Sequence, residues 1–85
     1  EPIFCVRNVV VAGRRTMGVD AQHVRYTFQD EKGVRFSAVA WRSAALYTYE
    51  IGEYVDVWFE PTLNEWQGRR SVEGRIARME PATER

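Results

Sequence analysis

The segment Asn-Glu-Trp-Gln-Gly-Arg-Arg, residues 64–70, combines an aromatic ring with two adjacent guanidinium groups in what reads as a turn. An indole ring gives a nucleobase a flat surface on which to stack, and a guanidinium donates two parallel hydrogen bonds to a phosphate. The side-chain amides beside the ring can donate to phosphates or to base edges. These residues therefore predict a contact with single-stranded nucleic acid, with packing within a β-hairpin as the alternative for Trp66, and the candidates are Asn64, Trp66, Gln67, Arg69 and Arg70.

The rest of the chain offers little that could catalyse a reaction. A two-metal hydrolase site needs several carboxylates and imidazoles around a pair of cations, but His23 is the single histidine, and Asp20 and Asp56 fall in different expected elements. Residues 13–18 have a glycine at each end but lack the Gly-Lys-Ser/Thr ending of a phosphate-binding loop. We expect no catalytic residue, no metal site and no cofactor within these 85 residues.

Length and composition bound the class of protein. A chain of 85 residues, 45% hydrophobic, is expected to form one small domain. Cys5 is the single cysteine, so no disulfide forms within the chain, and we expect its thiol to be buried in a strand. No signal segment or long apolar run is present in the sequence. These features predict a cytoplasmic protein without a membrane contact, and the start at Glu1 suggests a fragment of a larger one.

Alternation of apolar and polar residues defines the expected elements. Residues 23–28 are the clearest example, with Val24, Tyr26 and Phe28 on one face and basic or polar side chains on the other. A turn with Gly33 follows and predicts a β-hairpin. The full pattern is five strands, over residues 3–12, 23–28, 34–41, 53–61 and 69–79, with a loop over residues 13–20. One short helix is expected over residues 43–51, where the apolar residues Leu46, Tyr47 and Ile51 have near-helical spacing. In the fourth strand Val55, Val57 and Phe59 are expected to face inward.

This order predicts an all-β domain, the five-stranded Greek-key barrel of the oligonucleotide-binding (OB) fold, with the short helix between the third and fourth strands. The domain would cover residues 3–81, leaving 82–85 as a tail. An SH3-like barrel is the alternative, but it usually lacks a helix at that position. Trp41 is expected to pack against the helix, and Trp58 to lie on the outside of the fourth strand.

The distribution of charge indicates where this barrel would bind. Formal net charge is zero, but residues 1–42 carry seven basic against four acidic side chains. OB domains bind through the face of strands 2 and 3 and the loops beside it. On that scheme the acidic side chains from Glu50 to Glu65 lie mostly on the fourth strand, away from the groove. The basic candidates fall in the first loop or on strands 2 and 3, and they are Arg14, Arg15, His23, Arg25 and Arg35.

At this point the sequence resembles a known family. Residues 63–81, LNEWQGRRSVEGRIARMEP, are similar to the closing hairpin and strand of the OB domain in RecJ, the bacterial single-strand-specific DNA exonuclease. Residues 23–44 and 51–61 resemble the hairpin before the short helix and the entry to the fourth strand. The resemblance implies a single-stranded-DNA-binding domain of a 5′-to-3′ exonuclease whose catalytic core, using divalent Mn or Mg, lies outside this chain.

The implied partners are single-stranded DNA, the remaining domains of the parent exonuclease, and a repair or replication protein. A second reading from a different class stays open: a protein-interaction barrel that docks another domain through Trp58 and the nearby acids Glu53 and Asp56. Binding of RNA instead of DNA is a further alternative that these residues do not decide.

Overall fold

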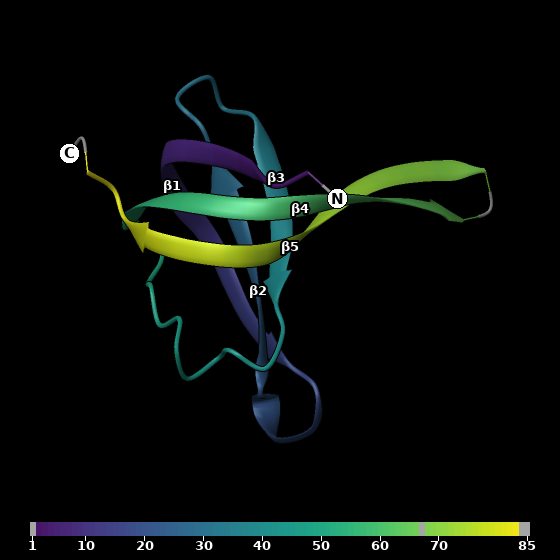
Figure 1. Cartoon of the computed structure of the whole chain (residues 1–85), viewed down its shortest axis with the longest axis horizontal. Coiled ribbons are helices and arrows are strands. Elements are labelled where there is room, and N and C mark those ends of the chain that lie inside the picture. The colour runs from purple at the N-terminus through teal and green to yellow at the C-terminus, as the bar shows by residue number, and fades with distance from the viewer. Residues whose placement is uncertain (1, 67, 84–85) are drawn as a thin grey trace.

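Five strands form a closed barrel in the computed structural model, which describes residues 2–66 and 68–83, with side chains at 2–62, 68 and 73–83. The neighbours around the barrel follow the order β1-β2-β3-β5-β4 (Figure 1). The strands are β1 (Phe4–Met17), β2 (His23–Gln29), β3 (Arg35–Ala40), β4 (Tyr54–Trp66) and β5 (Arg69–Pro81). The expected five-stranded OB barrel is confirmed. In the described part of the chain no helix is long and apolar enough to cross a membrane.

The core follows the alternation of the sequence. Val24, Tyr26 and Phe28 of β2 are fully buried, as are Val55 and Val57 of β4, so the predicted inward faces are confirmed. Two partly buried rings extend this core toward the β3–β5 contact, because Phe36 and Phe59 stack with their centroids 5.2 Å apart. The inward face of one strand thus meets that of the next, as closure of a small barrel requires.

The barrel closes where β3 meets β5 in parallel. The registered partners are Ala38 with Gly74 and Val39 with Arg75. A Cβ atom at Gly74 would lie 2.7 Å from the Phe59 ring and 3.1 Å from the Cβ of Ala38. Glycine is therefore required at this position, because the ring and the neighbouring strand fill the space that a side chain would need.

Strand β1 is longer than the sequence predicted. The loop expected at residues 13–20 is wrong, because β1 continues through Met17, which pairs with His23 of β2. The register shifts between Val11 and Gly13, the mark of a β-bulge, so the glycine bends the strand and does not end it. Arg14 and Arg15 consequently belong to a strand rather than to a loop.

The helix expected at residues 43–51 is also wrong, and the one helical segment among the described residues is the 3-10 turn η1 (Val19–Ala21). Residues 41–53 cross one end of the barrel as a series of turns. A single bond of α-helical spacing is present, from the Tyr47 N–H to the Ser43 carbonyl at 2.9 Å. Leu46 and Ile51, expected to face inward, are 72% and 68% exposed. A nine-residue helix is marginal on its own, and tertiary contacts hold this segment instead.

Those contacts come from two side chains of the barrel. The Nη2 group of Arg14 donates to the carbonyls of Ala44 and Tyr47 at 3.3 and 3.0 Å. The hydroxyl of Tyr26, which accepts from the Arg14 Nε–H at 3.1 Å, donates to the Tyr47 carbonyl at 2.9 Å. In a helix these carbonyls would accept hydrogen bonds from backbone N–H groups. Here they accept them from the side chains of Arg14 in β1 and Tyr26 in β2.

Cys5 is exposed, so the expectation of a buried thiol is wrong. Its partner in the β1–β4 ladder is Trp58, and both side chains belong to the outer face of the barrel. Alternation along β1 turns Val6 toward the core and Cys5 toward solvent.

We predict that Gly74→Ala lowers the free energy of unfolding by about 1–3 kcal/mol, because the added methyl group must displace the Phe59 ring or separate β3 from β5. Urea unfolding followed by tryptophan fluorescence measures the change. Gly13→Ala is the matched control, since its Cβ would meet Thr27 at an ordinary 3.5 Å. An equal decrease in the free energy of unfolding for both variants would mean that a methyl group at Gly74 meets no more steric hindrance than one at Gly13.

Candidate nucleic-acid interface

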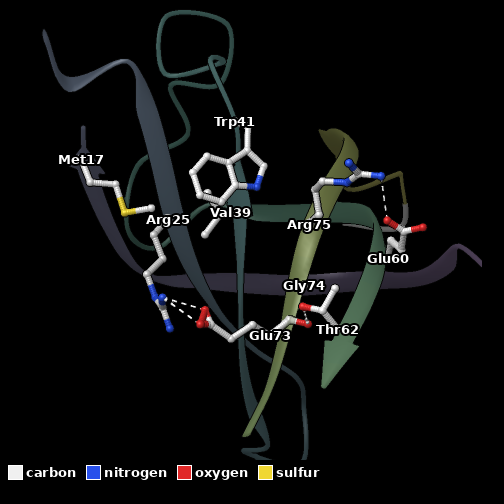
Figure 2. Close-up of a pocket in the computed structure, with 9 residues that line it drawn as sticks. All are labelled: Met17, Arg25, Val39, Trp41, Glu60, Thr62, Glu73, Gly74 and Arg75. Atoms are coloured by element: carbon white, nitrogen blue, oxygen red, sulfur yellow. Dashed lines mark hydrogen bonds and ion pairs between the residues drawn. The ribbon is translucent and has the colours of Figure 1, made fainter. Parts of the chain in front are cut away.

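A cavity of about 480 Å³ opens on the outer face of the barrel, over the line where β3 meets β5 (Figure 2). Its floor is apolar, because Val39 of β3 and Gly74 of β5 both line it, and Trp41 stands above that floor in Figure 2. Met17 reaches it from the end of β1, and Thr62 from the base of the β4–β5 hairpin. The remaining lining residues are charged: Arg25, Glu60, Glu73 and Arg75.

Trp41 is the largest exposed apolar group of this cavity. It is 52% exposed, so the expectation that it packs against a helix is wrong. The ring meets His23 edge-on, with the two centroids 4.9 Å apart. His23 is itself fixed, because its Nδ1 accepts a hydrogen bond from the Arg42 N–H at 2.8 Å. An indole that is supported at one edge and open elsewhere is suited to stack against a planar ligand.

His23 also packs closely against the connection that precedes it. A Cβ atom at Gly18 would lie 2.6 Å from the imidazole Cδ2, and this glycine has a φ of +91°. The histidine therefore joins the β1–β2 connection, the end of β3 and the Trp41 ring. It acts as a spacer between these segments, a role that the sequence pattern did not indicate.

Two arginines face each other beside the cavity. Arg15 and Arg25 are registered partners of β1 and β2, and both line a shallow groove that continues from the cavity. Arg25 is bound to Glu73 of β5 at 2.9 Å. Arg15 is exposed and has no ion pair with the described side chains. The outer face of β1 and β2 thus offers one unneutralised and one paired guanidinium group.

The cavity also contains carboxylates. Glu60 of β4 binds Arg75 of β5 at 2.7 Å, on the side of the cavity opposite the Arg25–Glu73 pair (Figure 2). The expectation that the acidic residues lie away from the groove is therefore wrong for Glu60. The bulge between Trp58 and Phe59 keeps Glu60 in register with Arg75 and on the outer face.

The structure places only some of the residues predicted from sequence at the cavity. Arg15, His23 and Arg25 lie at the cavity or the adjoining groove. Arg14 lines that groove too, but its guanidinium is held by Tyr26 and the 41–53 segment. Arg35 pairs with Gln29, far along the β2–β3 hairpin from Trp41.

For the candidates in the β4–β5 hairpin, the structure describes the backbone of residues 64–66 and 69–70 but not their side chains. The backbones of Trp66 and Arg69 pair with each other, as do those of Asn64 and Ser71, and of Glu65 and Arg70. In Figure 1 this β4–β5 ribbon extends well beyond the barrel. Gln67 and the side chains of the other four candidates, Asn64, Trp66, Arg69 and Arg70, lie outside the described residues.

The cavity residues that the sequence analysis missed include Trp41 and Arg75. A signal for Trp41 was present, because Phe36, Ala38 and Ala40 form the inward face of β3. The same period of two continues the outer face from Val39 to Trp41. No comparable signal marks Arg75, since its place depends on the parallel contact between β3 and β5.

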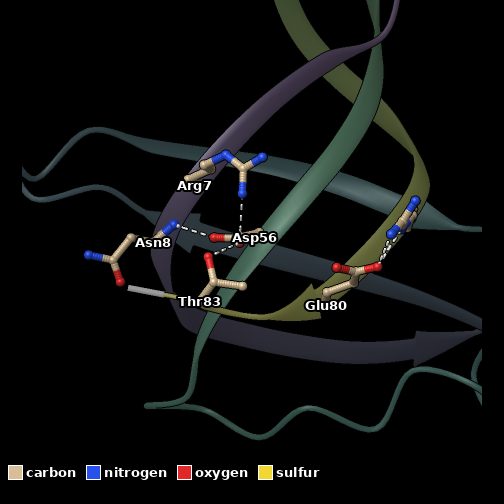
Figure 3. Close-up of polar contacts among 6 residues, drawn as sticks. Arg7, Asn8, Asp56, Glu80 and Thr83 are labelled. Atoms are coloured by element: carbon tan, nitrogen blue, oxygen red, sulfur yellow. Dashed lines mark hydrogen bonds and ion pairs between the residues drawn. The ribbon is translucent and has the colours of Figure 1, made fainter. Parts of the chain in front are cut away.

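Outside the cavity, polar contacts link β1, β4 and the residues after β5 (Figure 3). Asp56 is 1% exposed and accepts hydrogen bonds from the Asn8 N–H at 2.8 Å, from Arg7 at 3.3 Å and from the Thr83 hydroxyl at 3.4 Å. Trp58 lies on the outside of β4, as expected, where the guanidinium groups of Arg7 and Arg78 lie 5.7 and 4.8 Å from its ring centroid. The tryptophan here is covered, in contrast to Trp41.

The resemblance implies a divalent metal for the parent exonuclease, and the described residues do not fit one. Among the side chains that the structure describes, at residues 2–62, 68 and 73–83, no three of His, Cys, Asp or Glu come close enough to hold a cation. The two carboxylates of the cavity, Glu60 and Glu73, are each engaged by an arginine.

Comparison with known proteins agrees with this architecture. A chain of a replication protein A heterotrimer bound to ssDNA superposes with a TM-score of 0.58 and 26% identity, over 96% of this chain and 57% of that one. This chain therefore spans little more than half the length of that relative. The mitochondrial single-stranded DNA binding protein Rim1 from S. cerevisiae gives a TM-score of 0.61 at 6% identity, over 93% and 90% of the two chains.

A search of the curated proteins found no match. The family model of the RecJ OB domain, however, matches residues 1–78, nearly the whole sequence. With the closed five-stranded barrel already established from the structure, the conclusion is direct: the chain belongs to the RecJ OB domain family.

Proposed function

We propose that this chain binds single-stranded DNA as the OB domain of a RecJ-like 5′-to-3′ exonuclease. The observation that carries the proposal is the half-exposed Trp41 in a cavity beside Arg25, on the face of β2 and β3 with which OB domains bind. Family membership supports it. So do the two structural neighbours, which are by name an ssDNA-bound protein and a single-stranded DNA binding protein.

Two interactions would hold the strand. A base stacks on the Trp41 indole, a contact that every base can make because each has a π face. Phosphates follow the guanidinium groups of Arg15 and Arg25 along the outer face of β1 and β2. Trp66, Arg69 and Arg70 of the β4–β5 hairpin would then contact the strand where it leaves the barrel. Cations and rings placed in this way bind a strand whose bases are unpaired.

The domain itself, residues 3–81, is proposed to be non-catalytic and to work for a catalytic core elsewhere in a longer protein. That core would carry the divalent Mn or Mg and cleave the strand that this domain holds. The proposed setting is DNA repair or recombination in the cytoplasm, with a repair or replication protein as a further partner. DNA is preferred to RNA because of the family alone.

The alternative of a protein-docking face centred on Trp58 has less support. Asp56, one of its two acids, is buried under Arg7 and Thr83 and is not accessible to a partner. The carboxylate of the other, Glu53, accepts a hydrogen bond from the Glu50 N–H at 2.9 Å. Both acids are thus used to fix the chain's own backbone or strands.

Trp41→Ala is predicted to weaken binding to a single strand of about ten nucleotides by about 1–3 kcal/mol, because one stacked base loses its platform. Fluorescence anisotropy of a labelled oligonucleotide of mixed sequence measures the affinity without relying on tryptophan emission. Trp58→Phe is the control, since this ring does not line the cavity and is covered by Arg7 and Arg78. A loss for Trp58→Phe with no loss for Trp41→Ala would place the strand at the Trp58 surface and not at the cavity.

Arg15→Ala is predicted to reduce the slope of log affinity against log salt by about 0.7, the value for one lost phosphate contact with a single strand. The same titration at several salt concentrations gives the slope. Lys32→Ala removes an equal charge from the β2–β3 turn and should leave the slope unchanged. If both variants reduce the slope alike, the phosphates respond to overall charge, and the proposed path past Arg15 is wrong.

A further inference from the structure

The centre of the proposed DNA-binding cavity contains acidic groups, which is unexpected for a surface that binds a polyanion. Glu60 and Glu73 line it together with Trp41 and Val39. Carboxylates at this place repel phosphate groups, while the guanidinium groups beside them attract phosphates. The cavity is therefore suited to hold bases, with the phosphates displaced toward its rim.

Burial supports this division. The side chains of Glu60 and Glu73 are 15% and 29% exposed, whereas their partners Arg75 and Arg25 are 62% and 37% exposed. In each pair the carboxylate belongs to the wall of the cavity and the guanidinium is nearer to solvent.

Each carboxylate keeps capacity to accept further hydrogen bonds. Arg75 reaches one oxygen of Glu60 through a single nitrogen. A single nitrogen of Arg25 reaches the two oxygens of Glu73 at 2.9 and 3.5 Å, the second being a weak contact. An ionised carboxylate has about four acceptor positions, so neither pair saturates its acid within the described residues.

Bases differ in what they offer to such acceptors. Cytosine, adenine and guanine each carry an exocyclic amine that donates hydrogen bonds. Thymine and uracil have no exocyclic amine: where cytosine carries its amine they carry a carbonyl oxygen, which a carboxylate repels, and their one donor at that edge is the ring N3–H. A pairing of Glu with the cytosine amine is an established mode of base recognition.

From this arrangement we propose that the cavity prefers bases with an exocyclic amine, with Glu60 and Glu73 as the hydrogen-bond acceptors that select them. The inference rests on the proposed single-stranded DNA binding and adds a base preference to it. Stacking on Trp41 accepts any base, so the two glutamates set the preference and the indole supplies affinity common to all bases.

The test compares the affinity of the chain for oligodeoxycytidine and for oligodeoxyuridine, each of about ten nucleotides. The bases of these two strands differ only at the Watson–Crick edge. One charge-assisted hydrogen bond predicts about tenfold tighter binding of the cytidine strand. In the double variant Glu60→Gln, Glu73→Gln the ratio should fall to about one, because an amide accepts from cytosine and donates to uracil. Both affinities should rise in that variant, since two negative charges are removed.

Glu80→Gln is the control, because it removes an acid and its ion pair with Arg78, and neither residue lines the cavity. It should keep the cytidine preference. Equal binding of the two strands to the unaltered chain would overturn the base preference and leave the proposed function intact. A preference that persists in the double variant would also overturn the assignment to these glutamates. Failure to bind either strand would contradict the proposed function itself.

Discussion

The short parallel contact between β3 and β5 is the constraint on which the rest of the structure depends. It brings together strands that are far apart in the sequence, and it does so at Gly74, where the Phe59 ring and Ala38 leave no room for a side chain. The same contact sets Val39 beside Arg75 on the outer face. The same β3–β5 contact therefore closes the barrel and forms the floor of the cavity.

Two bulges in β1 then decide which side chains reach the binding face. The irregularity after Val11 turns Arg14 toward Tyr26 and the 41–53 segment and leaves Arg15 outside, opposite Arg25. The second irregularity contains Asn8, whose φ is +58° and whose N–H is bound by the buried Asp56. Hydrogen bonds of this kind hold a strained residue in place. Strand β1 therefore has two roles. Arg14 binds the 41–53 segment at the end of the barrel, and Arg15 supplies a cation to the interface.

Much of the fold was predictable, because β2 and β4 alternate cleanly and Gly33 marks the hairpin between β2 and β3. The errors have physical causes. Gly13 looks like a strand end but is a bulge, and the 43–51 segment has helical spacing but is held by Arg14 and Tyr26. His23 and Arg25 were found from alternation in residues 23–28, and Arg15 from its place in the expected first loop of the barrel. Glu60, Glu73 and Arg75 could not be placed on the cavity from sequence, because only the parallel β3–β5 register brings them there.

The central claim is that single-stranded DNA binds at the outer face around Trp41. The most direct test is a measurement that reports binding at individual residues. Nuclear magnetic resonance of the isotope-labelled chain, titrated with a short single strand, reports which amides and indole N–H groups change their chemical shifts. The account predicts that the changes concentrate at the Trp41 indole and at the amides of Val39, Arg25 and Gly74. Changes confined to Trp58, Cys5 and their neighbours, which do not line the cavity, would contradict it.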